Sequence, residues 1–419
     1  MSEVILHPVN KEIPKVTVLL ELPAAHRIQD DVEAIEAAHV LAQYFRQEAA
    51  LRDRTRRLPN VEIARFSESG LGGITVPKAY GGAGVCWTTL AEIVRIISVA
   101  DPALGQIPQN HFGILNVLEQ TGTPDQKAFF YGAILRGARL GNAGPERTSK
   151  NVLDVRTRIT KSDDSDGSDY LLNGTRFYST GALFAHWIPT KALDEAGRSV
   201  FVFVEQHSAG LSIIDDWSGF GQRTTASGTV IFDNVRVPRQ HIISLEKIND
   251  SANNTGPVSQ LIQAAIDAGI ARSALEDTVL FLQENTRSWV DSHASCAAAD
   301  PLTIRVIGAL FIQLHAAEAL LERAADTLDR AVLPISFEQM AQASIDVAEA
   351  KVLTTEIALK ASEKLFELAG SQATLAKYNL DRHWRNARVH TLHDPVRWKY
   401  FSIGNFYLNQ ISPPRHAWS

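Results

Sequence analysis

Cysteine is scarce in this sequence of 419 residues, which contains only Cys86 and Cys296. Neither residue has a partner at the spacing of a zinc site or of a redox pair, and two cysteines cannot cross-link a chain of this length. A disulfide-stabilised scaffold is therefore excluded, and we expect the reducing cytoplasm to be the compartment in which the protein works.

An excess of basic charge and a long hydrophobic run are both missing. The chain has 41 Lys and Arg against 47 Asp and Glu, a net charge of -6, so bulk charge does not favour a nucleic-acid or anionic-membrane partner. The most apolar stretch near the N-terminus, residues 16–25, contains Glu21 and is too short to span a bilayer. We therefore expect neither a nucleic acid nor a membrane as partner.

Nucleotide-binding loops are missing as well. No Gly-x-Gly-x-x-Gly follows a predicted strand and no Walker loop occurs, so the chain has no evident site for NAD or ATP. The composition is otherwise that of an ordinary globular protein, with 45% hydrophobic and 21% charged residues. At about 150 residues per domain, the length suits two to three domains.

Hydrophobic periodicity divides the first third into an arm and a helical domain. The arm, residues 1–28, contains three prolines. Apolar residues spaced by three and four predict a helical domain over residues 29–140. Its helices are predicted at 32–52, 60–69, 87–100, 110–120 and 124–136.

Residues 141–250 form a predicted β-domain. Val155, Thr157 and Ile159 alternate with polar residues, which is typical of a half-buried strand. The Asn173-Gly174 pair predicts the turn of a hairpin between strands at 170–172 and 175–179. Further strands are predicted at 199–205, 211–217 and 229–238.

Residues 251–419 are predicted to be helical again. Long helices are expected at 258–285, 303–332 and 344–368, the last of them stopped by Gly370. Their length favours antiparallel packing into a four-helix bundle. The predicted fold class is therefore α+β, with a β-domain between two helical domains.

Four segments carry a family resemblance, and they occur in order between residues 30 and 415. They are the loop VPKAYGGAG at 76–84, the LNGTR stretch at 172–176, the strand FDNVRVP at 232–238 and the helix that ends near Arg287. Together they resemble the acyl-CoA dehydrogenase superfamily. The resemblance implies an N-terminal helical domain, a central β-barrel, a C-terminal four-helix bundle and a homotetramer with flavin at the interfaces.

The residues at the expected position of the dehydrogenase base differ from that family. Dehydrogenases of the superfamily abstract a proton with a glutamate, but here the corresponding position holds Asp394, and residues 256–265, the alternative position, contain no acid. The sequence instead reads His390-x-x-His393-Asp394-Pro395. Segments 381–395 and 215–223 resemble the superfamily's flavin-dependent monooxygenases, which oxidise sulfur heterocycles and serve sulfone assimilation.

That branch implies a two-component enzyme. Its members receive FMN as FMNH2 from a separate NAD(P)H:flavin reductase and oxygenate a small, sulfur-containing substrate with O2 through a C4a-hydroperoxyflavin. FAD remains an alternative cofactor. Where the branch has a tyrosine beside the substrate, this chain has Asn110, which favours a substrate other than a large aromatic sulfur heterocycle.

The two histidines are the predicted proton-transfer groups. Histidine can donate a proton near neutral pH, whereas an ionised carboxylate cannot. Because Pro395 disfavours helical geometry at Asp394, we expect the helix to end there, with His390 and His393 on one face. The helix dipole should then favour protonated His393 as the donor, supported by His390.

The resemblance also assigns flavin-site residues by position. Asn142 matches a group at the ring edge, Thr180 stands for a serine hydroxyl, Arg287 matches an arginine that reaches the flavin phosphate of a neighbouring subunit, and Gln372 replaces an arginine. The predicted catalytic set is His393, His390, Asn142 and Thr180. The predicted cofactor set is Asn110, Asn142, Ala143, Glu146, Arg147, Arg176, Phe177, Tyr178, Ser179, Thr180, Trp217, Arg287, Ser371, Gln372 and His393.

Four alternatives stay open at this point. The chain could be an FAD-dependent acyl-CoA dehydrogenase or oxidase with Asp394 as base, or a flavin-binding scaffold without catalysis. The histidines could be structural, or His383, His390, His393 and Asp394 could hold a metal ion. We predict no metal site, because no further Cys/His cluster accompanies them.

Overall fold

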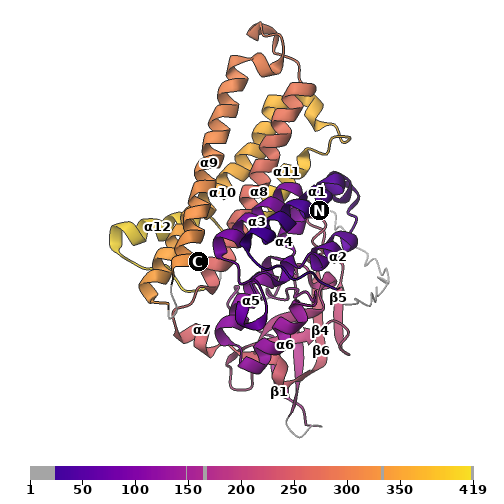
Figure 1. Cartoon of the computed structure of the whole chain (residues 1–419), viewed down its shortest axis with the longest axis vertical. Helices are drawn as coiled ribbons and strands as arrows, with labels where there is room; N and C mark the ends of the chain where they lie inside the picture. The colour runs from indigo at the N-terminus through magenta and orange to yellow at the C-terminus, as the bar shows by residue number, and fades with distance from the viewer. Residues whose placement is uncertain (1–23, 148, 164–167, 332–334, 417–419) are drawn as a thin grey trace, which may run out of the picture.

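The computed structural model describes residues 24–147, 149–163, 168–331 and 335–416. The chain passes from a helical layer through a β-sheet to a long helical bundle (Figure 1). This order agrees with the predicted one. Most of the arm predicted for residues 1–28 lies outside the described residues.

The N-terminal layer consists of six helices in the described chain, close to the predicted ranges. Asp30 accepts a hydrogen bond from the Glu33 amide and so begins the first helix. The short fourth helix was not predicted, and it places Gln106 at its end. The helices are α1 (Asp31–Thr55), α2 (Asn60–Glu68), α3 (Trp87–Ala100), α4 (Pro102–Gln106), α5 (Gln109–Thr121) and α6 (Pro124–Ile134).

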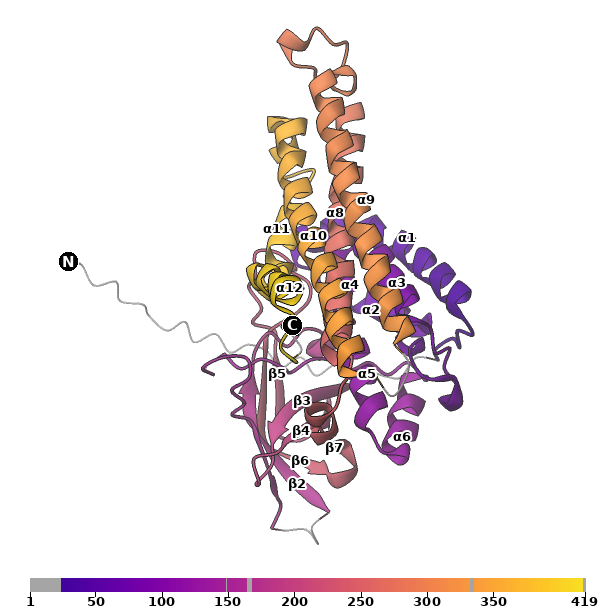
Figure 2. The ribbon, with the colours of Figure 1, turned by 90° about the vertical axis from the view of Figure 1, so that its left-hand side faces the viewer.

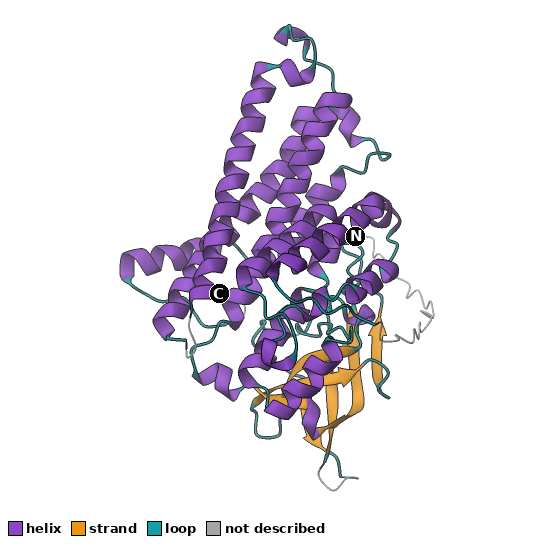
Figure 3. Ribbon diagram, in the orientation of Figure 1, coloured by secondary structure: helices purple, strands orange, loops and turns teal. Residues whose placement is uncertain are grey.

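The middle of the chain forms one curled seven-stranded sheet, drawn in orange in Figure 3. The strands run in the order β5-β6-β2-β1-β3-β4-β7, and all neighbours are antiparallel except β1 and β3. This sheet is the predicted β-barrel domain. Its strands are β1 (Arg158–Lys161), β2 (Asp169–Arg176), β3 (Trp187–Leu193), β4 (Ser199–Glu205), β5 (Leu211–Ile214), β6 (Thr229–Pro238) and β7 (Ile242–Ser244).

The hairpin predicted at Asn173-Gly174 is wrong. These residues lie inside the continuous strand β2, opposite a bulge in β6 where Asn234 has a φ of 50°. The Asn173 and Asn234 side chains bond each other across the bulge. A Cβ at Gly174 would lie 2.3 Å from Thr157 Oγ1, so the glycine permits a close approach of the chain rather than a turn.

The C-terminal part is the predicted helical bundle. Three long helices lie side by side, and the short α11 packs against α8 and α10 in the fourth place (Figure 2). Gly370, with a φ of 72°, ends α10 as predicted. The helices are α7 (Glu246–Asp250), α8 (Thr255–Glu284), α9 (Pro301–Arg330), α10 (Phe337–Ala369), α11 (Asp381–His390) and α12 (Arg397–Asn409).

Helix α9 is apolar on both of its faces. By length and composition it is the one helix in the described chain that could cross a membrane. Its buried leucines, Leu310, Leu314 and Leu321, pack in the bundle, while Ile304 and Ile312 are exposed. Short 3-10 turns join the main elements at Leu71–Gly73, Lys78–Tyr80, Ala182–Phe184, Arg239–His241, Val290–Ser292, Ala297–Ala299 and Ser371–Thr374.

Candidate active site

A buried charged cluster holds His390 at the end of α11. Its Nδ1 lies 2.5 Å from Asp267 Oδ1 on α8, and the other oxygen of Asp267 accepts bonds from Lys351 Nζ at 2.8 Å and Thr355 Oγ1 at 3.0 Å on α10. The side chains of Asp267, Lys351 and His390 are 0% exposed. These hydrogen bonds therefore link α8, α10 and α11 beside His390, the first of the two predicted catalytic histidines.

The protonation states in this cluster follow from its contacts. Burial alone would raise the pKa of Asp267, but Lys351 and His390 outweigh it and hold the pKa below its ordinary value. Burial lowers the pKa of His390, although Asp267 opposes this shift. Asp267 is thus ionised, and the neutral His390 donates its Nδ1–H to it.

His393 lies beyond the helix rather than on it, so the predicted helix end is wrong. Helix α11 ends at His390, and the chain then turns, with the His393 amide bonded to the His390 carbonyl. Asp394 is thereby buried with a carboxylate oxygen 3.5 Å from Lys399 Nζ. Contacts with α10 and α12, which sequence spacing does not show, end the helix four residues early.

The predicted protonated state of His393 is also not supported. The side chain is exposed overall, yet both ring nitrogens have protein partners: Nδ1 lies 2.6 Å from the His390 carbonyl and Nε2 lies 3.2 Å from Gln106 Nε2. Loss of water around the ring is the main cause that lowers the pKa of His393 below the ordinary 6.5, and the Lys351 ammonium adds to the shift. The resting ring is therefore neutral.

Thr180 belongs to a chain of buried hydroxyl groups. Thr225 Oγ1 donates to the Gln222 carbonyl at 3.0 Å, so Ser227 must donate to Thr225 and Thr180 must donate to Ser227, each across 2.7 Å. The single proton of Thr180 is thus used inside the protein. The expectation that Thr180 offers a hydroxyl donor to flavin is wrong for this arrangement, which leaves it an acceptor.

Gln222 connects this hydroxyl chain to α11. The backbone N–H of Gln222 donates to Asn386 Oδ1 at 2.7 Å, and the backbone carbonyl of Gln222 accepts from Trp217 Nε1 at 2.9 Å. A Cβ at Gly221 would lie 1.9 Å from the Arg385 carbonyl, so the loop touches the helix there. Gln222 has a φ of 48° and is buried.

These contacts form a closed circuit around the predicted catalytic residues. Gln106 contacts His393, a Cβ at Gly181 would lie 3.1 Å from the Ile107 carbonyl, and Gly181 bonds Thr225. Asn386 lies one helical turn before His390. We call this set the contact ring: Gln106, Ile107, Thr180, Gly181, Gln222, Thr225, Ser227, Asn386, His390 and His393.

Asn142 and its neighbours lie beside the contact ring. Asn142 Nδ2 donates to the Tyr178 carbonyl at 3.2 Å, and Ala143 is fixed by Thr190 Oγ1 at 2.7 Å. Phe177 is buried in the sheet, with the Arg147 guanidinium 3.6 Å above its ring. The structure therefore brings the Asn142 loop to the end of β2.

Glu146 and Arg176 bond to each other and to the backbone around this loop, so they do not present free polar groups to a ligand. Their side chains are paired at 3.0 Å and are 5% and 2% exposed. Arg176 also donates to the Gly144 and Lys191 carbonyls, and Glu146 accepts from Thr157 at 2.9 Å. The prediction that both bind cofactor directly is therefore not supported, because their polar groups fix the loop to the sheet.

Aromatic side chains lie on the open side of the ring. Tyr178 is 53% exposed with a φ of 57°, and its ring centroid lies 6.1 Å from that of the half-buried Trp217. Ser179 is buried, and Asn110, at the start of α5, is half-buried one turn after Gln106.

Three predicted residues lie far from the contact ring. Arg287 follows the end of α8, and Ser371 and Gln372 follow the end of α10. The 17 residues of α8 from Asp267 to Glu284 span about 26 Å at 1.5 Å per residue. One chain therefore does not bring the predicted phosphate contacts to its own histidines.

Sequence reasoning missed Gln106, Asp267 and Lys351. A signal exists for one of them, since Asp267 stands alone in the apolar run AAIDAGI, whereas Lys351 follows Asp346 and Glu349 in α10. A lone charge on a buried helical face needs a partner. Gln106 had no such signal, because its helix was not predicted.

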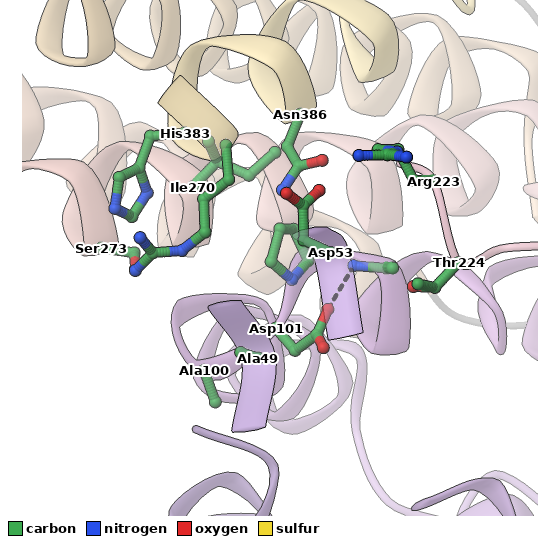
Figure 4. Close-up of a pocket in the computed structure, with 13 residues that line it drawn as sticks. Ala49, Asp53, Ala100, Asp101, Arg223, Thr224, Ile270, Ser273, His383 and Asn386 are labelled. Atoms are coloured by element: carbon green, nitrogen blue, oxygen red, sulfur yellow. Dashed lines mark hydrogen bonds between the residues drawn. The ribbon is translucent and has the colours of Figure 1, made fainter. Parts of the chain in front are cut away.

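A polar pocket beside the first part of α11 is lined by Asn386 of the contact ring and by none of the residues of the predicted catalytic and cofactor sets (Figure 4). It lies between α1, α4, α8 and α11, and Asp53, Asp101, Arg223 and His383 line it. His383 bonds Asp277 at 2.7 Å, whereas His390 bonds Asp267, so the histidines face different partners. Within the described residues, no group of three His, Cys, Asp or Glu side chains could hold a metal ion.

The contact ring has the polar groups that a flavin ring needs. In the contact ring, Gln106 Oε1, both side-chain amide atoms of Gln222 and His390 Nε2 are buried without a hydrogen-bond partner among the described residues, and so is Oγ of Ser179, which precedes Thr180. Such atoms are costly unless a ligand or water satisfies them. The carbonyl and N–H edge of an isoalloxazine offers both donors and acceptors, so these residues fit FMN.

Comparison with known proteins agrees with this fold. Acyl-CoA dehydrogenase family models match the chain twice, the N-terminal domain over residues 28–138 and the C-terminal domain over residues 261–398. The dibenzothiophene monooxygenase of Mycolicibacterium goodii is 32% identical over 397 residues, covering 91% of this chain and 95% of that protein. The chain belongs to the acyl-CoA dehydrogenase family.

Two further proteins show where in the acyl-CoA dehydrogenase family the similarity lies. The probable FMNH2-dependent monooxygenase SfnC of Pseudomonas putida is 29% identical and covers 91% of this chain and 96% of its own. The crystal structure of FMN-bound TdsC from Paenibacillus sp. A11-2 has a TM-score of 0.87 at 30% identity, covering 92% of this chain and 100% of that one. The similarity thus includes the sheet, which lies between the segments matched by the family models.

Proposed function

We propose that this acyl-CoA dehydrogenase family member is a two-component monooxygenase. It takes FMNH2 from a separate NAD(P)H:flavin reductase and transfers one oxygen atom of O2 to a small sulfur compound. Reduced FMN supplies the electrons that activate O2 when it is bound. The observation that carries the proposal is the imidazole of His393 in the contact ring, with Nε2 3.2 Å from the Gln106 amide nitrogen, and the similarity to FMNH2-dependent and FMN-bound relatives supports it.

The residues of the ring have separate tasks in this proposal. His393 exchanges a proton at Nε2, and His390, fixed by Asp267, holds the turn that carries it. Gln222 and Ser179 satisfy the polar edge of the flavin, and the aromatic pair Tyr178 and Trp217 limits the access of water.

The carboxylates near the ring argue against a dehydrogenase that uses FAD. Asp267 is paired with Lys351, and Asp394 faces Lys399 at 3.5 Å. A base for an unactivated carbon acid needs a carboxylate that is not held by a cation. The buried unpartnered groups favour a site that binds a ligand, a property that a flavin-binding scaffold without catalysis would share, so activity has to separate the scaffold from the enzyme.

One experiment separates the three functions. The protein is mixed with photoreduced FMN under nitrogen, then with ¹⁸O2 and one of a panel of sulfides, sulfones and sulfinates. We expect tighter binding of FMNH2 than of FMN, and one ¹⁸O atom in the product, the second leaving as water while FMNH2 becomes FMN. Bleaching of bound FAD by an acyl-CoA would indicate a dehydrogenase, and neither reaction would indicate a scaffold.

We further propose that the working form is a cytoplasmic homotetramer. Helix α12 exposes Trp398, Phe401 and Leu408, and α9 exposes Ile304 and Ile312. Such apolar surface favours contact with other copies of the chain. Because Arg287 is about 26 Å or more from the contact ring along α8, a neighbouring copy would bring it to the flavin phosphate.

Arg287→Ala is expected to weaken FMN binding by about 1.5–3 kcal/mol, the contribution of a hydrogen bond to a charged group. Arg287 is exposed in the single chain, so the substitution should leave the fold intact. The measurement is the dissociation constant of FMN from fluorescence quenching. The matched control is Arg54→Ala, an exposed arginine on α1, and equal constants for both variants would place the phosphate elsewhere.

A further inference from the structure

The two contacts of the His393 ring determine which nitrogen carries its proton. The His390 carbonyl, 2.6 Å from Nδ1, can only accept a hydrogen bond, so Nδ1 must be the N–H. A neutral imidazole has one N–H, and Nε2 therefore presents a lone pair. The partner of Nε2 is the amide nitrogen of Gln106 at 3.2 Å, which is a donor.

Gln106 is held in place from its own side. It is the last residue of α4, a helix that begins after Asp101, and Asp101 is bound by the buried guanidinium of Arg52 at 2.9 Å. The Gln106 side chain is 4% exposed, and its Oε1 has no hydrogen-bond partner among the described residues. If the amide were turned over, Oε1 would face the lone pair of His393 Nε2 and repel it.

We propose that Gln106 is a positioning residue that fixes the orientation of the His393 ring by donating to Nε2, while the His390 carbonyl sets the tautomer, so that the ring waits as a hydrogen-bond acceptor at Nε2. Only one part of this inference rests on the proposed function, namely that His393 takes part in oxygen transfer. The ring must gain a proton before it can donate one. When it does, rotation of the Gln106 amide offers Oε1 as the acceptor, so one side chain serves both protonation states.

The charged groups around the turn fit this arrangement. Asp267 faces His390 from α8, Lys351 faces it from α10, and Asp394 lies on the turn itself beside Lys399 from α12. Gln106, from α4, is the uncharged neighbour at Nε2. A neutral donor there adds no counter-charge that would favour the imidazolium.

The test reads the tautomer directly in the protein without flavin or substrate. The full chain is labelled with ¹⁵N-histidine, and the His393 signals are assigned by their loss in His393→Gln. We expect Nδ1 to carry the proton in the native protein at pH 7. In Gln106→Glu, a carboxylate beside Nε2 should raise the pKa of His393 by about one unit or more. In Gln106→Met the His390 carbonyl still holds the proton on Nδ1, and the Nε2 signal should shift because its hydrogen-bond donor is lost.

Activity provides the second readout. Gln106→Met is expected to lower turnover roughly tenfold to a hundredfold, as misplacement of a reacting group does, while the FMN dissociation constant changes less than twofold. Gln206→Met, which removes a similar bond to the Leu183 carbonyl, is the matched control and should change neither tautomer nor turnover.

Two results would overturn the inference: an Nε2–H tautomer in the native protein, or ¹⁵N shifts of His393 that stay the same in both Gln106 variants. The spectra are recorded without any reaction, so they test the role of Gln106 independently of activity. If the protein oxygenates no sulfur compound, that result contradicts the proposed function and leaves the inference about Gln106 standing.

Discussion

His393→Ala is expected to lower turnover with FMNH2 and O2 roughly 10²–10⁴-fold, the usual effect of losing an acid–base group. The ring is the proton-exchanging group of the contact ring, and its Nε2 is turned toward Gln106 at 3.2 Å. FMN binding should change by less than about 0.5 kcal/mol, because His393 lies on the turn after α11 and its substitution removes two hydrogen bonds within the protein but few packing contacts. Product formation under a constant supply of FMNH2 measures the effect.

A neighbouring residue on the same turn supplies the control. Leu392 is 65% exposed, and Leu392→Ala should keep turnover within a factor of two or so of the native protein if only the imidazole matters. Undiminished turnover in His393→Ala would remove this histidine from the mechanism. A parallel loss in both variants would instead indicate that the turn as a whole had moved.

Asp267→Ala should have the largest effect on stability, lowering the free energy of unfolding by about 3–5 kcal/mol. The substitution leaves the fully buried Lys351 ammonium without its counter-charge and His390 Nδ1 without its acceptor. A buried charge that loses its partner costs far more than the pair contributed. Urea unfolding at fixed protein concentration, with the midpoint and slope compared, measures the loss.

Two other variants show whether burial is the cause. Asp326→Ala breaks an exposed pair with Arg330 and should cost less than about 1 kcal/mol. Asp267→Asn keeps an acceptor for His390 but removes the negative charge. It should lower the free energy of unfolding by an amount between those of Asp326→Ala and Asp267→Ala. If Asp267→Ala cost no more than the surface variant, Lys351 would have to reach solvent, contrary to its 0% exposure.

The elements that the sequence predicted best depend on neighbours along the chain. The helix at 87–100 and the strand at 229–238 have the predicted bounds, because each is set by its own periodicity and its own ends. Asp30 and Gly370 start and stop their helices through contacts within a few residues. The resemblance then ordered these elements into one family fold.

The predictions that failed concern groups whose partners lie on other elements. Asn173-Gly174 has the composition of a turn, but a bulge in β6 and the Thr157 side chain make it part of a strand. Thr180 keeps a hydroxyl, but Ser227, which follows 47 residues later, takes its proton. Residue type showed what each side chain can do, and the tertiary partner determined whether it is free to do it.

The chain's own residues determined that a β-domain follows one helical segment and precedes another, and that histidines stand where relatives have a carboxylate. Periodicity and residue identity are local properties, so they can be recognised without the fold. The tertiary structure decided that His393 rests neutral with Nε2 as acceptor, since the His390 carbonyl and Gln106 meet it from two different elements. It also decided that Arg287 lies away from these histidines, because the rigid length of α8 separates them.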